Sequence, residues 1–146
     1  MTKPKYHNKH TYPLPKEKGR SKPKIPIRLI NYDTGVSRKI NALIDTGSDY
    51  CVIPSYITKS IGFKLTEEDK IEKGLKGISG KRIDTYVHGF KIEILDADMK
   101  NVVCRLDTHA YTVKTENLTP ILGTHGFLKN FNLSIDYKKN TITLMW

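Results

Sequence analysis

An apolar segment, Ala42-Leu43-Ile44, runs directly into Asp45-Thr46-Gly47, and a second apolar segment, Cys51-Val52-Ile53, follows shortly after. This pattern predicts that Asp45 ends a buried strand, at a sharp turn that exposes its carboxylate. Thr46 offers a hydroxyl to lock the turn, and Gly47 lacks a Cβ, so backbone or substrate can approach closely. On these residues alone, Asp45 is equally well interpreted as a structural residue at a strand-to-loop corner or as a catalytic carboxylate.

A second Asp-Thr-Gly, at residues 33–35, has a different setting. It lies in Asn31-Tyr32-Asp33-Thr34-Gly35-Val36-Ser37, between two segments of alternating apolar residues, 25–30 and 38–44. Asn, Asp and Gly are the residues that hairpin turns require. The sequence therefore predicts a hairpin over these segments, with Asp33 as a turn residue.

The rest of the chain is also dominated by short strand patterns. We expect strands at residues 86–95, 101–106, 133–137 and 141–146, and a hairpin tip between Gly74 and Lys81. Pro54 and Gly62 bracket one plausible short helix. Many short strands with one or two short helices predict an all-β, barrel-like domain.

A late motif adds specificity to the early one. Residues 120–131 read Pro-Ile-Leu-Gly-Thr-His-Gly-Phe-Leu-Lys-Asn-Phe, and the expected last strands follow them. In order and spacing, the two motifs resemble the retropepsin-like aspartic proteases over about residues 24–146. In that family a strand ending in Asp-Thr-Gly-(Ser/Ala) is followed by a flap hairpin, an apolar-apolar-Gly motif, a short helix and a closing strand. One departure is Thr124-His125-Gly126, where viral members usually carry an Arg.

The resemblance implies a closed, acid-protease β-barrel and an aspartic endopeptidase that acts on protein or peptide substrates. Since this chain supplies one such carboxylate and is too short for two lobes, it implies a homodimer in which each subunit contributes Asp45. It assigns catalysis to Asp45, Thr46 and Gly47, and substrate binding to Asp49 and to the flap-tip residues Gly77, Ile78 and Gly80. Thr46 would also brace the two active-site loops across the dimer axis.

Hydrolysis by paired carboxylates needs one ionised and one protonated group, so that activity is expected to fall at both pH extremes. Thr46 and Ser48 stand beside Asp45 in the sequence and are expected to donate hydrogen bonds to its carboxylate. The last strand, residues 141–146, is a candidate for the family's terminal dimer sheet or, alternatively, an ordinary edge strand.

The net charge of +10 is concentrated at the N-terminus, where residues 1–24 hold eight Lys or Arg against Glu17 alone. Five of the seven prolines fall in or at the edge of this segment, and apolar residues are sparse. We therefore expect residues 1–24 to be a disordered arm and residues 25–146 the protease domain. The arm is interpreted mainly as a solvated tail, with weak contact to nucleic acid or an acidic surface as its functional alternative.

Two other functions stay open. The first is a retropepsin-like module that binds peptides or proteins without turnover; the second is a basic nucleic-acid-binding protein with an incidental Asp-Thr-Gly. No metal or other cofactor is expected, because no Cys/His cluster has ligand spacing. Cys51 and Cys104 are expected to be buried free thiols. A cytoplasmic location is expected, as is the absence of a membrane span, which would need ~20 apolar residues.

Overall fold

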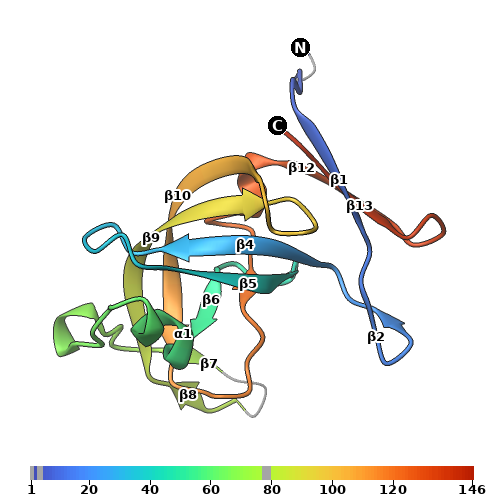
Figure 1. The fold of residues 1–146 in the computed structure, drawn as a ribbon. Helices are drawn as coiled ribbons and strands as arrows, with labels where there is room; N and C mark the ends of the chain where they lie inside the picture. Colours follow the sequence, from blue (N-terminus) through green and yellow to red (C-terminus); the bar gives the residue numbers. More distant parts are fainter. Residues whose placement is uncertain (1, 3–4, 77–79) are drawn as a thin grey trace.

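The computed structural model describes residue 2 and residues 5–76 and 80–146 of the chain. Six strands close a barrel in the order β10-β6-β11-β5-β4-β9, and a three-stranded terminal sheet, β1-β13-β12, extends from one side of it (Figure 1). The elements are β1 (Lys9–Pro13), β2 (Lys16–Glu17), β3 (Arg20–Ser21), β4 (Lys24–Ile30), β5 (Ser37–Ile44), β6 (Val52–Pro54), α1 (Ser55–Ser60), η1 (Glu67–Asp69), β7 (Leu75–Lys76), β8 (Arg82–Ile83), β9 (Thr85–Leu95), β10 (Val102–Val113), β11 (Ile121–Leu122), η2 (Leu128–Asn130), β12 (Asn132–Asp136) and β13 (Thr141–Met145). The prediction of an all-β closed barrel with short helices is confirmed.

The hairpin predicted around Asp33 is present as β4 and β5. Its turn is held by Asn31, whose side-chain oxygen accepts the Asp33 N–H at 2.9 Å and whose amide donates to the Ile61 carbonyl at 3.0 Å. Asp33 is exposed at the tip. It is therefore a turn residue, as predicted.

The barrel interior is filled by alternating side chains of its strands. Ile25, Ile27 and Leu29 of β4 are fully buried, and Ile92 and Ile94 of the neighbouring β9 are equally buried. Strand β9 pairs with both β4 and β10, so the long β9–β10 ribbon closes the barrel around this core. None of the helices among the described residues is long and apolar enough to cross a membrane.

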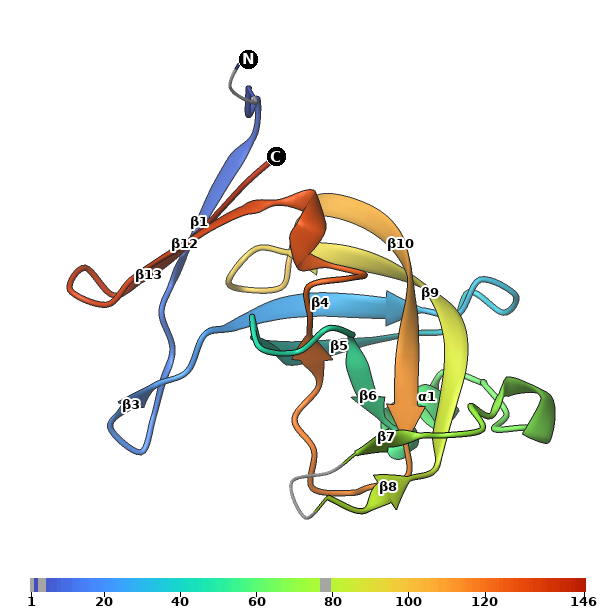
Figure 2. The same cartoon turned by 180° about the vertical axis from the view of Figure 1, so that it is seen from behind.

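Strand β11 has an unusual position that matters for the site. It is inserted between β5 and β6, which are consecutive in sequence, and it runs parallel to β5 and antiparallel to β6. The loop from 45 to 51 must therefore pass around the end of β11 before the chain can form β6. Both ribbon views place this loop and the terminal sheet on the same side of the barrel (Figure 2).

The N-terminal segment differs from its prediction. Strand β1 pairs along its whole length with β13, and Tyr12 and Leu14 are 2% and 5% exposed. The Tyr12 hydroxyl donates to the Leu95 carbonyl at 2.6 Å, and residues 16–21 form the small β2–β3 hairpin. The predicted disorder is therefore wrong for residues 9–21: a segment poor in apolar residues is ordered by pairing with a strand more than 120 residues away.

The C-terminal strand is neither a free strand nor an edge. β13 is the central strand of the terminal sheet, with β1 on one side and β12 on the other, and its Ile142 and Leu144 are fully buried. The predicted helix after Pro54 is present as α1. The short helix expected after Gly123 is reduced to turns and the single 3-10 element η2.

Candidate active site

Asp45 follows the last residue of β5 and is half-buried. Its N–H donates to the carbonyl of Leu122, the last residue of β11, at 3.1 Å. The β-ladder between β5 and β11 thus continues by one hydrogen bond into the loop. This bond fixes the backbone of Asp45 at the end of the barrel strand, as the sequence predicts.

The turn after Asp45 is closed by Asp45 itself. Its carboxylate Oδ1 accepts the Gly47 N–H at 2.9 Å, and its carbonyl accepts the Ser48 N–H at 3.2 Å. These hydrogen bonds close the turn without the Thr46 hydroxyl, so the expectation that this hydroxyl locks the turn is wrong. The Ser48 hydroxyl donates to the Tyr50 carbonyl at 2.8 Å instead of to the carboxylate, so that expectation is wrong too.

The far end of the loop is anchored to the segment that follows β11. The N–H groups of Thr124 and His125 donate to the carbonyls of Ser48 and Asp49 at 2.9 and 2.8 Å. Gly123 lies directly beneath, where a Cβ would be 2.2 Å from the Tyr50 carbonyl oxygen. The main chain of Thr124 and His125 therefore holds this loop without the Arg that viral retropepsins usually carry at this point.

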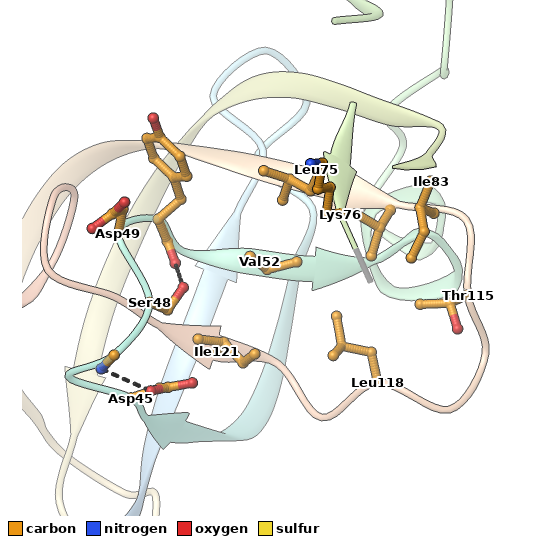
Figure 3. Close-up of a pocket in the computed structure, with 13 residues that line it drawn as sticks. Asp45, Ser48, Asp49, Val52, Leu75, Lys76, Ile83, Thr115, Leu118 and Ile121 are labelled. Carbon is orange, nitrogen blue, oxygen red and sulfur yellow. Dashed lines mark hydrogen bonds between the residues drawn. The ribbon is translucent and has the colours of Figure 1, made fainter. Parts of the chain in front are cut away.

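A pocket of about 510 Å³ opens beside Asp45, Gly47 and Asp49. In the view of Figure 3, Asp45 and Asp49 lie toward one end of the pocket, and Ile83 and Thr115 toward the other. The apolar side chains that line it come from five strands and from the segment before β11: Val52, Leu75, Ile83, Val113, Leu118 and Ile121. Two carboxylates, Asp45 and Asp49, thus stand at one end of a largely apolar pocket.

The β7–β8 hairpin covers part of this pocket, since Leu75, Lys76 and Ile83 line it. Its base is held by Thr85, whose hydroxyl donates to the Ile83 carbonyl at 2.8 Å and accepts the Leu75 N–H at 2.9 Å. The predicted hairpin is therefore present. Gly80 has a φ of +77°, as expected for a hairpin tip, whereas Gly77 and Ile78 lie outside the described residues.

The structure thus brings Asp45, Gly47 and Asp49 to one pocket, beneath the hairpin that carries Gly80. Sequence reasoning missed Leu118 and Ile121 as pocket residues, and also Tyr50, which lines the rim. Ile121 was visible as half of the apolar pair before Gly123. Leu118 lies in an irregular segment without any motif, so only the folded chain reveals its place.

The two cysteines offer no alternative nucleophile of ordinary reactivity. Cys51 is buried and Cys104 half-buried, and both are free thiols. Burial raises the pKa of both thiols above the usual value, which disfavours the thiolate that attacks carbonyls. Within the described residues no group of His, Cys, Asp and Glu side chains could hold a metal ion.

Comparison with solved structures identifies the fold. A retropepsin-like aspartic protease from Rickettsia conorii superposes with a TM-score of 0.63 at 15% identity, covering 100% of this chain and 98% of that chain. The retroviral protease-like domain of Ddi1 from Leishmania major gives a TM-score of 0.55 at 17% identity, covering 84% and 87%. The sequence matches no protein-family model and no curated protein sequence. The chain has the retropepsin-like fold.

Proposed function

We propose that this chain is an aspartic endopeptidase that works as a homodimer, with one Asp45 from each subunit in a shared site. The observation that carries the proposal is the position of Asp45: it directly follows a barrel strand of a retropepsin-like fold and borders an apolar pocket beneath the β7–β8 hairpin. Asp45 is half-buried, so its carboxylate stays accessible from the side of the barrel on which the loop lies.

The chemistry needs two carboxyl groups. One ionised Asp45 takes a proton from water as the water attacks the scissile carbonyl, and the protonated partner donates to the carbonyl oxygen. Two carboxyl groups held ~3 Å apart cannot both ionise easily, so they share one proton over a range of acidic pH. The Gly47 N–H, which donates to Asp45 Oδ1 at 2.9 Å, helps to fix the orientation of that carboxyl group.

In a symmetric dimer with its two-fold axis beside Asp45, the partner's Asp45 is the second carboxylate, so one chain does not need two catalytic aspartates. Thr46 is exposed next to Asp45, which leaves its hydroxyl free to reach the partner loop across that axis. Asp49 is exposed on the same rim and is suited to hold the main chain of a bound peptide. The β7–β8 hairpin, which carries Gly80, closes over the substrate and excludes water.

The lining of the pocket points to the kind of substrate. Leu75, Val113, Leu118 and Ile121 offer no side-chain hydrogen-bonding group to the space beside Asp45. A buried polar side chain without a partner costs free energy, whereas an apolar one gains from burial. We therefore expect cleavage next to medium-sized apolar residues.

The test is digestion of a mixed peptide library by the wild type and by Asp45→Asn, with Asp33→Asn as the matched control from the other Asp-Thr-Gly. Asn keeps the shape of Asp but cannot share the proton, so we expect cleavage to disappear for Asp45→Asn and to stay within a few-fold of wild type for Asp33→Asn. Equal losses in both variants, or no loss at Asp45, would refute the assignment. Peptide binding without cleavage by the wild type would favour a non-catalytic binding module.

A further inference from the structure

A second cavity, of about 450 Å³, lies next to the catalytic pocket and shares one wall with it. That wall is Tyr50, which lines both cavities. Its ring packs edge-on against Tyr111 of β10, with the centroids 4.4 Å apart, and the centroid of the His125 ring is 6.4 Å from that of Tyr50. The aromatic side chain thus forms a ridge between the two cavities.

The second cavity differs in character from the first. Lys129 brings a positive charge to its lining, and His109 and His125 bring N–H donors. One carboxylate, Asp107, is also present. This carboxylate interacts with the nearby Tyr32 hydroxyl and thereby raises the pKa of Tyr32 to about 12. The charge of Lys129 therefore balances that of Asp107, and the imidazoles of His109 and His125 add N–H groups that can donate to a negatively charged ligand.

The loop from Asp45 to Tyr50 connects the two cavities. The loop that starts at Asp45 ends at Tyr50, and the His125 N–H donates to the Asp49 carbonyl at 2.8 Å. A peptide that left the catalytic pocket past Asp49 would therefore cross Tyr50 before it reached the second cavity. An extended peptide advances about 3.3 Å per residue, so a substrate residue outside the catalytic pocket can reach the second cavity.

We propose that this second cavity binds an anionic side chain of the substrate, a carboxylate or a phosphate, at a position outside the catalytic pocket. The proposal rests on the proposed function, because the ligand is part of the same peptide. Lys129 supplies the charge, and His109 and His125 supply hydrogen bonds. The site would select substrates by affinity, and its effect would appear in KM.

The test is a series of peptides with one apolar scissile core, in which a single Glu is moved outward one residue at a time, each paired with a Gln peptide. At one outer position we expect the Glu peptide to be cleaved with a kcat/KM about three- to tenfold above its Gln partner, through KM. Lys129→Gln should bring this ratio close to one. Lys138→Gln, which removes an exposed lysine on the β12–β13 turn, should leave the ratio unchanged.

A peptide with phosphoserine at the same position distinguishes the two ligands. If its kcat/KM, divided by that of the Gln peptide, exceeds the ratio for the Glu peptide, the cavity prefers a phosphate. If this ratio is equal or lower, the cavity prefers a carboxylate. Cleavage with equal rates for Glu and Gln at every position would overturn this proposal and leave the proposed function intact. A second measurement, binding of the labelled Glu and Gln peptides to Asp45→Asn by fluorescence anisotropy, is independent of turnover. Suppose that the Glu peptide binds more tightly than the Gln peptide, that Lys129→Gln abolishes this difference, and that the wild type cleaves neither peptide. This result would support anion binding in the second cavity and would overturn the proposed peptidase activity.

Discussion

Asp45 is positioned by main-chain contacts that come from distant parts of the sequence. Leu122 accepts its N–H, and the N–H groups of Thr124 and His125 hold the far end of its loop. These contacts require the two segments to approach closely, and Gly123 is the residue that permits it. A Cβ at Gly123 would be 2.2 Å from the Tyr50 carbonyl oxygen and 2.7 Å from that of Ser48.

We therefore expect Gly123→Ala to displace the Asp45 loop, to lower the free energy of unfolding by about 1–3 kcal/mol and to reduce activity strongly. Urea unfolding and peptide cleavage measure the two effects. The control is Gly89→Ala on β9, where the nearest atom to a Cβ is 3.9 Å away and the cost should be below about 1 kcal/mol. Equal stability of the two variants would show that the position of the Asp45 loop does not depend on the missing Cβ at Gly123.

Among the strands of the barrel, β4, β9 and β10 share one charged rung. Glu93 is directly opposite Arg28 on one side and Arg105 on the other. Its carboxylate accepts from Arg28 at 2.7 Å and from Arg105 at 2.8 Å. Burial of Glu93 acts to raise its pKa, but the hydrogen bonds from Arg105 and Arg28 outweigh it, and the pKa lies below the usual value.

A lowered pKa in the folded state means that Glu93 stabilises the protein above its unfolded pKa of ~4.3, and that this contribution is lost as the pH falls through the folded value. Glu93→Gln should lower the free energy of unfolding by about 1–2 kcal/mol at neutral pH. The difference from wild type should disappear in acid. Urea unfolding over a pH series measures it, with the exposed Glu68→Gln as control; a pH-independent difference would contradict the ionic origin.

The terminal sheet indicates how a dimer can form. Because β13 already pairs on both sides, only the outer edges of β1 and β12 are open to a second subunit among the described residues. β1 carries Lys9 and Pro13, which commonly block edge pairing, and β12 carries neither Lys nor Pro. We therefore expect two β12 strands to pair across the two-fold axis.

Ser134 is exposed at the centre of β12. In a symmetric β12 pair, Ser134→Lys places two positive charges close together across the axis, which is unfavourable. We expect the dimer dissociation constant to rise several-fold, as measured by sedimentation velocity over a dilution series. Thr11→Lys, which puts the same charge on the β1 edge, is the matched control; a larger effect from Thr11→Lys would place the interface at β1 instead.

For the molecule as a whole, the sequence predicted what short-range patterns encode. Alternating apolar residues marked β4 and β5, short strand patterns marked β9 and β13, and turn residues marked the Asn31–Gly35 hairpin tip. The Asp45 motif and the Gly123 motif together indicated the fold. All of these features depend on residues that are close in sequence.

What the sequence did not reveal depends on pairing between distant segments. β1 has few apolar residues, but Tyr12 and Leu14 enter a core that other strands build. The Thr46 and Ser48 hydroxyls were expected to act on the Asp45 carboxylate, but the backbone N–H of Gly47 takes that role. The second cavity joins β10, His125 and Lys129, which no local pattern connects.

The central claim is that one active site contains the Asp45 of two subunits, and subunit mixing tests it most directly. Wild type and Asp45→Asn are mixed at constant total concentration, allowed to exchange subunits, and assayed for peptide cleavage. If both carboxylates are needed, only wild-type homodimers are active, and the rate falls with the square of the wild-type fraction, to about one quarter in an equal mixture. A rate that falls in direct proportion, to about one half, would mean that each chain carries a complete site and would contradict the shared pair.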